Sequence, residues 1–456
     1  MVEKINRENL RGKKITIIGL KKSGYAAAIL GSELGAKVFV SELNIDEDIK
    51  NNKNSLVDDG VNCEIGKHAK RIYDADYWVV SPGVSSDSEI IKKALELKIP
   101  IVGEIEFASN LTKIPIIAVT GSNGKSTTVS IIYNMLKTKK LSPILAGNIG
   151  IPLSKIISEE IKNPAIGNIL VLEISSFQLE FIDQFKPIIS VFLNISPDHL
   201  DRHKNMDEYI KMKLKMITNL KESDKIVYNA DDDTFRKKFQ SHRRYNFPFS
   251  IKNKTPFFSV NKTKIYDDKN QPFISLDDIL LKGKHNLSNL IAAATVAKLL
   301  KVDNQTIRKT MENYSGIEHR LQIIRELNGV TYINDSKATN IQSVIVAVNS
   351  FDNSVILILG GKNKNSDFRL LLPHTKRHVK HIVSYGEAGG EIATAIGDAV
   401  RLNRVSSLSQ AVASAHKLAV PGDIVLMSPG CASFDQFINF EERGNTFAKL
   451  INDLKN

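Results

Sequence analysis

The feature that most constrains the fold is an apolar run that stops at a glycine-rich turn and resumes as a helical pattern. The run IPIIAVT covers residues 114–120, and the turn GSNGKS follows it at residues 121–126. A strand that passes through such a turn into a helix directs backbone N–H groups and the positive helix end at an anion. We therefore expect a phosphate-binding α/β unit in the middle of the chain.

The side chains of this turn indicate a nucleotide phosphate. Lys125 suits the β- and γ-phosphates, and the hydroxyl of Ser126 is a suitable ligand for Mg²⁺. The usual P-loop carries a further glycine where this chain has Val119, so the match is partial. The alternative interpretation is a tight strand–helix turn with an incidental GKS. We prefer the phosphate site because two glycines, a lysine and three hydroxyls fall at one predicted strand end.

Strand-like apolar runs alternate with helical patterns along almost the whole chain, which indicates parallel α/β layers. With 456 residues, the chain is too long for one hydrophobic core. We predict a Rossmann-like N-terminal domain at residues 1–112, a central P-loop ATP-binding α/β domain at 113–314 and a Rossmann-like C-terminal domain at 315–456. Residues 247–278 alternate irregularly, and we expect hairpins or an irregular insert there.

The composition excludes some classes of function. A net charge of +12 could indicate nucleic-acid binding. However, the lysines are scattered and no basic run alternates with aromatic residues, so we expect no nucleic-acid partner. Cys63 and Cys431 are far apart in sequence, which fits a reducing cytoplasm. The polar start and the lack of an apolar run of roughly 18 residues favour a cytoplasmic protein without membrane insertion.

A second chemical signal follows the phosphate turn. Glu173 lies inside the apolar run ILVLE, where an unpaired charge would be costly. A metal ion or another cation is the natural partner, although a salt bridge at a strand end is an alternative. His199, in SPDHLDRH, lies at another predicted strand end. A lone histidine is more often structural, so His199 counts only as a member of this set.

Several motifs together resemble the Mur ligases of peptidoglycan synthesis. The segments TGSNGKST, LEISSFQLE, NISPDHLDRH, YNADDD and KGKHNLSN occur in the order seen in that family. Its short glycine turn is shared with folylpolyglutamate synthases, which accounts for Val119. The segments INDSKATN, ILGGKNKNSDF and SPGCASFDQFINFEERG resemble the members that add D-glutamate. DSKATN stands where the next ligase of the pathway has DNPR. The resemblance covers essentially the whole chain and is least distinctive at residues 247–278.

The resemblance implies an ATP-dependent ligase that joins D-glutamate to UDP-N-acetylmuramoyl-L-alanine through an acyl phosphate, with Mg²⁺. We expect the protein to be a monomer. The alternative on the same scaffold is another Mur-type or folylpolyglutamate-type amide ligase. A P-loop ATPase that moves nucleic acid and a catalytically inactive binding protein are further alternatives. The second is disfavoured because Lys125, Ser126, Glu173 and Lys337 are all present.

The resemblance also implies roles for residues at the nucleotide and metal sites. Lys213 matches a lysine that the family carries as a carbamate, an anion able to ligate Mg²⁺; from spacing alone, Lys211, Lys213 and Lys215 could form a solvated helix face. The catalytic set is Lys125, His199, Lys213, His319 and Arg320. The implied metal ligands are Ser126, Glu173, His199 and Lys213. The implied ATP-binding residues are Gly121, Ser122, Asn123, Gly124, Lys125, Ser126, Thr127, Asn286, Asn289, Arg320 and Asp335.

The two other substrates have implied residues of their own. The turn GLKKSG has Lys21 in place of the second glycine of GxGxxG, which disfavours a dinucleotide there. The residues implied for the UDP-linked substrate are Lys22, Ser23, Gly24, Ser81, Asn148 and Ser175. Those implied for D-glutamate are Lys337, Thr339, Lys364, Ser433 and Phe440. Plain local roles are alternatives for some of these residues: helix capping for Asn286, turn formation for Asp335 and Pro82, and a polar loop for Lys364.

Overall fold

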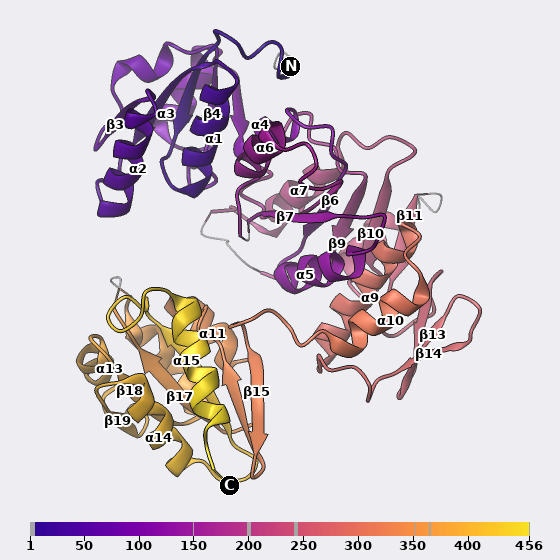
Figure 1. The fold of residues 1–456 in the computed structure, drawn as a ribbon, viewed down its shortest axis with the longest axis vertical. Helices are drawn as coiled ribbons and strands as arrows, with labels where there is room; N and C mark the ends of the chain where they lie inside the picture. The colour runs from indigo at the N-terminus through magenta and orange to yellow at the C-terminus, as the bar shows by residue number, and fades with distance from the viewer. Residues whose placement is uncertain are drawn as a thin grey trace. The chain divides into compact units, whose positions relative to one another are not determined.

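The computed structural model describes residues 5–148, 150–197, 202–240, 245–351, 353–363 and 366–455. The chain divides into two compact units, Met1–Tyr314 and Ser315–Asn456. The first unit holds two parallel sheets and a small antiparallel one, and the second unit holds one mixed sheet (Figure 1). The described helices include none that is long and apolar enough to cross a membrane.

The first sheet is parallel, in the order β3-β2-β1-β4-β5. Between β1 and β4 the strand order reverses, which is where doubly wound sheets bind their ligands. Its strands are β1 (Lys14–Ile18), β2 (Lys37–Glu42), β3 (Asn62–Ile65), β4 (Tyr77–Val80) and β5 (Ile101–Gly103). Its helices are α1 (Lys22–Glu33), α2 (Glu47–Asp58), α3 (Glu89–Glu96) and α4 (Glu104–Ser109), with a 3-10 turn at Lys70–Tyr73.

The central sheet is also parallel, in the order β11-β10-β9-β6-β8-β7. Every residue of β6 and β8 is buried, because helices cover both faces of a parallel sheet. Its strands are β6 (Ile116–Thr120), β7 (Pro143–Gly147), β8 (Ile169–Glu173), β9 (Ile189–Phe192), β10 (Lys225–Asn229) and β11 (Asn246–Phe249). Its helices are α5 (Lys125–Leu136), α6 (Leu153–Lys162), α7 (Met206–Leu214), α8 (Asp233–Phe239), α9 (Lys284–Leu299) and α10 (Asn304–Asn313), with a 3-10 turn at Lys215–Ile217.

The segment predicted as hairpins or an insert is partly both. Residues 258–275 form the antiparallel sheet β12 (Phe258–Val260), β13 (Lys264–Asp267) and β14 (Pro272–Ser275), which confirms the hairpins. Its first residues differ from the expectation, because β11 pairs in parallel with β10 at the edge of the central sheet.

The second unit contains a sheet in the order β15-β16-β20-β17-β18-β19, antiparallel at β15 and parallel elsewhere. Its strands are β15 (Gln322–Leu327), β16 (Val330–Asn334), β17 (Val355–Gly360), β18 (Val379–Tyr385), β19 (Leu402–Arg404) and β20 (Ile424–Gly430). Its helices are α11 (Ile341–Val348), α12 (Leu372–His378), α13 (Gly389–Ile396), α14 (Leu408–Leu418) and α15 (Phe440–Asn452), with 3-10 turns at Phe368–Leu371 and Gly397–Ala399.

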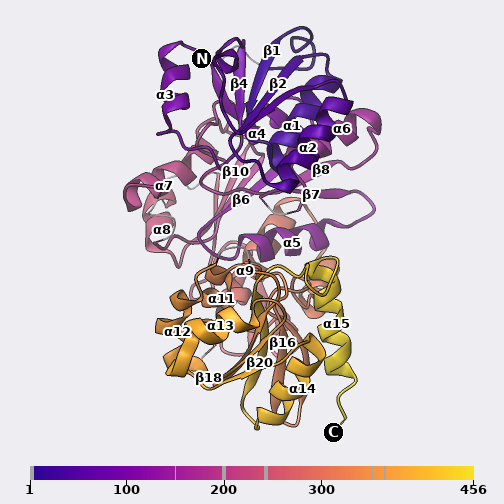
Figure 2. The ribbon, with the colours of Figure 1, turned by 90° about the vertical axis from the view of Figure 1, so that its left-hand side faces the viewer.

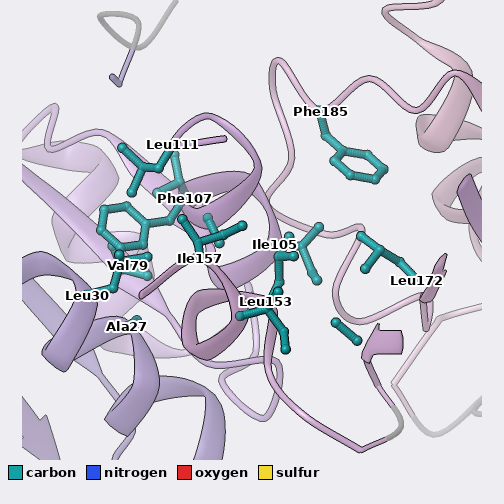
Figure 3. Packing of buried hydrophobic residues seen from close by; sticks show 14 of the residues in the cluster. Ala27, Leu30, Val79, Ile105, Phe107, Leu111, Leu153, Ile157, Leu172 and Phe185 are labelled. Carbon is teal, nitrogen blue, oxygen red and sulfur yellow. The ribbon is translucent and has the colours of Figure 1, made fainter. Parts of the chain in front are cut away.

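One hydrophobic core joins the first two parallel sheets. Helices α1, α4 and α6 pack side by side, and Phe107 of α4 and Ile157 of α6 belong to one buried cluster with Leu30 of α1 (Figures 2 and 3). Glu106 of α4 is almost fully buried and accepts backbone N–H bonds from residues 183–185 at 2.9–3.0 Å. The two parallel sheets of the first unit are therefore joined by packing as well as by the chain.

Candidate active site

The glycine turn leads from β6 directly into α5. Gly124 precedes the first residue of α5 and has φ = 82°, a conformation that suits glycine. A Cβ atom at Gly124 would overlap the side chain of Asn289, which is buried and lies on α9. The close approach of these two residues therefore brings one of the predicted ATP-binding asparagines to the turn. Asn286, one helical turn earlier, donates to the carbonyl of Lys282, while Gly283 occupies the helix cap.

Lys125 folds back over the turn from which it projects. Its Nζ donates to the carbonyls of Gly121 at 2.9 Å and Ser122 at 2.8 Å. Asn123 is exposed at the tip of the turn, and Thr127 is half-buried in the first turn of α5. The lysine charge therefore lies at the turn that leads into α5. There, the charge and the backbone N–H groups of the helix end both favour an anion.

Glu173 ends β8 and lies beside Val119 of β6 in the strand register. Its side chain is buried and accepts from Ser126 Oγ at 2.8 Å and from Asn148 Nδ2 at 2.7 Å. Among the described residues Glu173 forms no ion pair, so two neutral donors hold a buried carboxylate at the phosphate turn. This arrangement joins three predicted site residues from three segments of the chain.

Lys213 is 1% exposed, which rules out the solvated helix face as its environment. Its Nζ donates to the Gly121 carbonyl at 3.0 Å and lies 4.4 Å from the ring centre of Tyr209. Lys211 is exposed, and Lys215 donates to the carbonyl of Glu180 instead. Of the three alternating lysines, only Lys213 reaches the glycine turn.

The sequence reasoning missed the polar side chains of α7 and of the segment after β9 that form hydrogen bonds with the glycine turn. Tyr209 Oη lies 3.1 Å from Ser122 Oγ, which also donates to the Ser196 carbonyl at 3.0 Å. Asn194 accepts from the backbone N–H of Asn123 at 2.8 Å. Asn194 and Ser196 follow β9 in the segment NISPDH, where polar residues directly after a buried strand were the available signal.

The donors at the turn fit Mg²⁺, which usually takes one or two protein carboxylates together with substrate phosphates. Ser126 and Glu173 supply hard oxygen ligands. His199 lies outside the described residues. Within the described ranges, no three His, Cys, Asp or Glu side chains lie close enough to form a metal cage. The described donors therefore suit an ion shared with a nucleotide.

A second group of predicted residues lies at the switch point of the first sheet. Lys22, Ser23 and Gly24 begin α1 directly after β1, and Ser81 follows β4. A Cβ atom at Gly24 would overlap the carbonyl of Gly19, so the turn closes tightly against Ser81. Ser81 Oγ is buried and has no hydrogen-bond partner among the described residues. A bound ligand would satisfy it.

Ser175, also predicted for the UDP-linked substrate, lies just beyond β8. Its hydroxyl pairs with Gln178 Oε1 at 3.2 Å, and the same oxygen accepts the Ser175 backbone N–H at 3.0 Å. Its neighbour Ser176 contacts His203 Nε2 at 2.9 Å. The segment after Glu173 is therefore shaped by a local bond of Ser175 and by a bond of Ser176 to the distant His203.

His319 and Asp335 lie together in the second unit. The Asn334 amide donates to His319 Nδ1 at 3.1 Å, which places the ring proton of a neutral histidine on Nε2. Burial lowers the pKa of His319. Burial also raises the pKa of Asp335 to about 6, although its carboxylate accepts from Ser428 Oγ at 2.7 Å and from the backbone N–H of Leu321 at 3.2 Å. Arg320 is exposed beside them.

The residues predicted for D-glutamate lie on loops of the same unit. Lys337 Nζ is 6.0 Å from the ring centre of Phe440, Thr339 is half-buried and Ser433 is buried. Lys364 lies outside the described residues.

The sequence reasoning also missed Arg443, which is fully buried and connects two of these loops. It donates to Ser336 Oγ at 2.9 Å, to the Ser336 carbonyl at 2.8 Å and to the Cys431 carbonyl at 3.1 Å. Arg443 therefore fixes the spacing between the loop of Lys337 and the loop of Ser433.

Comparison with known proteins places the whole chain in one family. Three family models match it: the MurD N-terminal domain at residues 14–90, the Mur ligase middle domain at 119–297 and the Mur ligase glutamate ligase domain at 319–431. A UDP-N-acetylmuramoylalanine–D-glutamate ligase of Acidobacterium capsulatum is 38% identical over 97% of this chain and 96% of its own length. The chain belongs to the Mur ligase family.

Other relatives of this Mur ligase agree. The protein of the same name from Natranaerobius thermophilus is 40% identical over 97% of this chain and 98% of its own length. Two solved structures share the fold: the UDP-N-acetylmuramate-alanine ligase MurC of Thermotoga maritima, at 19% identity, and the MurF ligase of the same organism in complex with ADP, at 16%. Both have a TM-score of 0.53 and cover at least 97% of each chain. The predicted three-domain α/β architecture is thereby confirmed, whereas the domain boundaries stay a prediction.

Proposed function

We propose that this Mur ligase joins D-glutamate to UDP-N-acetylmuramoyl-L-alanine at the expense of ATP, in the synthesis of peptidoglycan precursors. The observation that carries the reaction class is the convergence of Ser126, Glu173 and Lys213 on the glycine turn. The choice of substrates is supported by relatives of that name, which match over nearly the full length of the chain.

Ligation needs an activated acid, because a carboxylate does not react with an amine in water. A carboxylate oxygen of the muramoyl substrate attacks the γ-phosphorus of ATP, and ADP leaves. The amine nitrogen of D-glutamate then attacks the acyl carbon, the C–O bond to phosphate breaks and the nitrogen loses its proton. Such a transfer depends on alignment and charge neutralisation more than on covalent help.

The residues of the glycine turn perform the alignment. Lys125 and the N–H groups at the start of α5 hold the β- and γ-phosphates. Ser126 and Glu173, with His199, would hold Mg²⁺, which neutralises phosphate charge when it is bound. Asn289 lies against the turn and would contact the nucleoside.

In the second unit, basic and hydroxyl side chains suit an amino acid with two carboxylates. Lys337, Lys364, Thr339 and Ser433 would bind D-glutamate, with Phe440 beside them. His319 and Arg320 would meet the phosphates and the acyl group, and Asp335 would orient the nucleotide.

We also propose that Lys213 works as a carbamate. Its neutral amine would attack CO₂, forming an N–C bond and releasing a proton, and the product is an anion that can ligate Mg²⁺. The position of Nζ, within hydrogen-bond distance of the Gly121 carbonyl, supports this role.

Replacement of Lys213 tests the carbamate. Lys213→Ala is expected to lower kcat on the order of 100-fold, the usual cost of one electrostatic group. Small carboxylic acids such as acetate should restore part of the activity, because they supply the missing carboxylate. Lys211→Ala, on the exposed side of the same helix, should behave like the wild type. Full activity of Lys213→Ala would contradict the proposal.

Phosphate release separates the candidate functions. ATP, UDP-N-acetylmuramoyl-L-alanine and one amino acid at a time are combined, and both phosphate and the new amide are measured. D-Glutamate should give both products, whereas L-glutamate, L-alanine and diaminopimelate should not. Phosphate release without an amide, or release stimulated only by DNA or RNA, would contradict the function.

The cellular setting follows from the substrates. We propose that the enzyme acts in the cytoplasm, where nucleotide-linked precursors and ATP are available, and as a monomer. Cys63 and Cys431 are both free thiols, as a reducing compartment requires. Light scattering of the purified enzyme with and without substrates tests the monomer, which a dimer mass would contradict.

A further inference from the structure

Two side chains of the central sheet's segments hold the turn that follows β4. Arg202 lies in NISPDHLDRH, and Glu180 ends LEISSFQLE. The turn, residues 81–86, begins with Ser81, whose buried hydroxyl has no partner among the described residues. Neither Arg202 nor Glu180 has a role in the proposed reaction so far.

The Arg202 guanidinium meets three successive carbonyl groups of this turn. One terminal nitrogen donates to Pro82 O at 3.1 Å and to Gly83 O at 3.4 Å. The other donates to Val84 O at 2.7 Å and to Glu180 Oε2 at 2.5 Å. An ammonium group cannot serve this many acceptors in a fixed planar arrangement, so the contact is specific for arginine.

Glu180 completes the contact from the other side. Its second oxygen accepts from the Ser86 hydroxyl and from the Ser86 backbone N–H at 3.4 Å. The Arg202 and Glu180 side chains are 15% and 10% exposed, so water screens the pair little. The ring of Phe177 lies 4.8 Å from the guanidinium carbon, and Lys215 Nζ binds the Glu180 carbonyl at 2.6 Å.

The same chain segment connects this contact to the phosphate site. Glu173, which accepts from Ser126, lies seven positions before Glu180 on the segment that leaves β8. Its intervening residues are fixed by the bonds of Ser175 to Gln178 and of Ser176 to His203. The turn after β4 is therefore held at a set distance from the glycine turn.

We propose that Arg202 is a positioning residue: with Glu180, it holds residues 81–84 in the shape that binds the UDP-linked substrate, and so places the carboxylate to be activated relative to the ATP site. The inference rests on the proposed function. It predicts that loss of Arg202 weakens binding of the nucleotide-sugar and leaves binding of ATP almost unaffected, because Arg202 contacts the turn after β4 rather than the glycine turn.

The chain offers a matched control. Arg7 forms an ion pair with Glu160 of α6 and donates to the Leu111 carbonyl, so it also joins the N-terminal part of the first unit to the central part. The described contacts of Arg7 include none with the turn after β4 or the glycine turn. Arg7→Met therefore reports the effect of removing a stabilising arginine away from the substrates.

Steady-state kinetics and thermal unfolding of the full chain test the inference. Arg202→Met should raise KM for UDP-N-acetylmuramoyl-L-alanine on the order of 10- to 100-fold, the usual effect of losing several charged hydrogen bonds, with KM for ATP within about 2-fold. Arg202→Lys keeps the charge opposite Glu180 but not the three carbonyl contacts, so KM for the nucleotide-sugar should stay raised. Arg7→Met should change neither KM.

Hydrogen exchange gives a readout that does not depend on turnover. In Arg202→Lys, the amides of residues 83–88 should exchange faster than in the wild type, with those of residues 121–127 unchanged. If Arg202→Met folds poorly, Arg202→Lys carries the test. Unchanged KM for the nucleotide-sugar, or equal rises in both KM values, would overturn the inference.

The inference and the proposed function fail in different ways. Calorimetric titration of the wild type with UDP and with the nucleotide-sugar measures binding without catalysis. If the wild type binds and turns over its substrates, and the Arg202 variants keep the wild-type KM for the nucleotide-sugar, the inference alone is overturned. A wild type that binds neither compound would contradict the proposed function and the inference together.

Discussion

Asp335 is a buried carboxyl whose ionisation opposes folding. Its ordinary pKa of 3.8 rises to about 6 in the folded protein, mainly because burial penalises the charge. The raised pKa means that the folded state binds the proton more tightly than the unfolded state. The contribution of Asp335 to stability is therefore greatest below pH 4 and falls as the pH rises through 6.

Removal of this charge should stabilise the second unit at neutral pH. Asp335→Asn should raise its free energy of unfolding at pH 8 by up to about 3 kcal/mol, since a shift of two pKa units is worth roughly that much. At pH 4 the gain should vanish, because the wild-type carboxyl is then protonated. Urea unfolding at several pH values provides the measurement, and a gain independent of pH would contradict it.

Asp367→Asn serves as the control for Asp335. Bonds to Arg369 lower the pKa of Asp367, so its stabilisation is present at neutral pH and is lost as the pH falls through its folded pKa. The two variants should therefore respond to pH with opposite signs.

Single residues differ in how far the sequence predicts them. Lys125 and Ser126 were predictable because the turn that holds them is local. Lys213 could not be told from Lys211 or Lys215 by spacing, because its burial depends on how α7 packs on the glycine turn. Arg443 gave no signal, since its partner Ser336 lies 107 positions away.

At the scale of elements, the strand–turn–helix unit of β6 and α5 depends on Gly124. Gly124→Ala would place a side chain at φ = 82° and against Asn289. We expect KM for ATP to rise by about 10-fold or more while the sheet stays folded, because the added strain and the overlap are both confined to the turn. Nucleotide titration measures the effect, with circular dichroism as the check on folding.

Gly60→Ala separates strain from overlap in this experiment. Gly60 has φ = 79°, and a Cβ atom there would meet no other atom within 4 Å. This variant should lose some stability but keep its ATP affinity. Normal ATP affinity in Gly124→Ala would show that ATP binding does not depend on the close approach of Asn289 to the glycine turn.

Elements with a local signal were predicted well, and those that depend on distant pairing were not. The runs at β6 and β8 are continuous apolar strands between turns, as buried parallel strands require. In contrast, β11 is four residues long and takes its place only by pairing with β10. Its sequence, NFPF, contains a proline and resembles the irregular segment that follows.

For the whole molecule, the hydrophobic cores follow the division at Tyr314. The buried clusters of residues 5–314 and those of residues 327–451 share no member. Calorimetry should therefore resolve two unfolding transitions, and residues 315–456 expressed alone should fold. ATP should raise the transition of the first unit, because the glycine turn belongs to it. A single transition, together with an unfolded fragment, would contradict independent folding.

The sequence predicted three α/β domains, but it carried no signal for how the first two would join. The apolar residues of α4 and α6 look like ordinary core positions, and only the folded structure shows that they share one cluster. Glu106 likewise reads as a surface residue of a short helix, although it is 1% exposed. Such joints depend on contacts between segments far apart in sequence.

The shared core beneath α4 and α6 bears on inhibitor design. Because packing and the Glu106 bonds hold the turn after β4 at a set distance from the glycine turn, a bivalent compound that reaches both would cross a span already set in the free enzyme. A stiff linker cut to that span would gain affinity by avoiding the entropy that a flexible tether loses on binding.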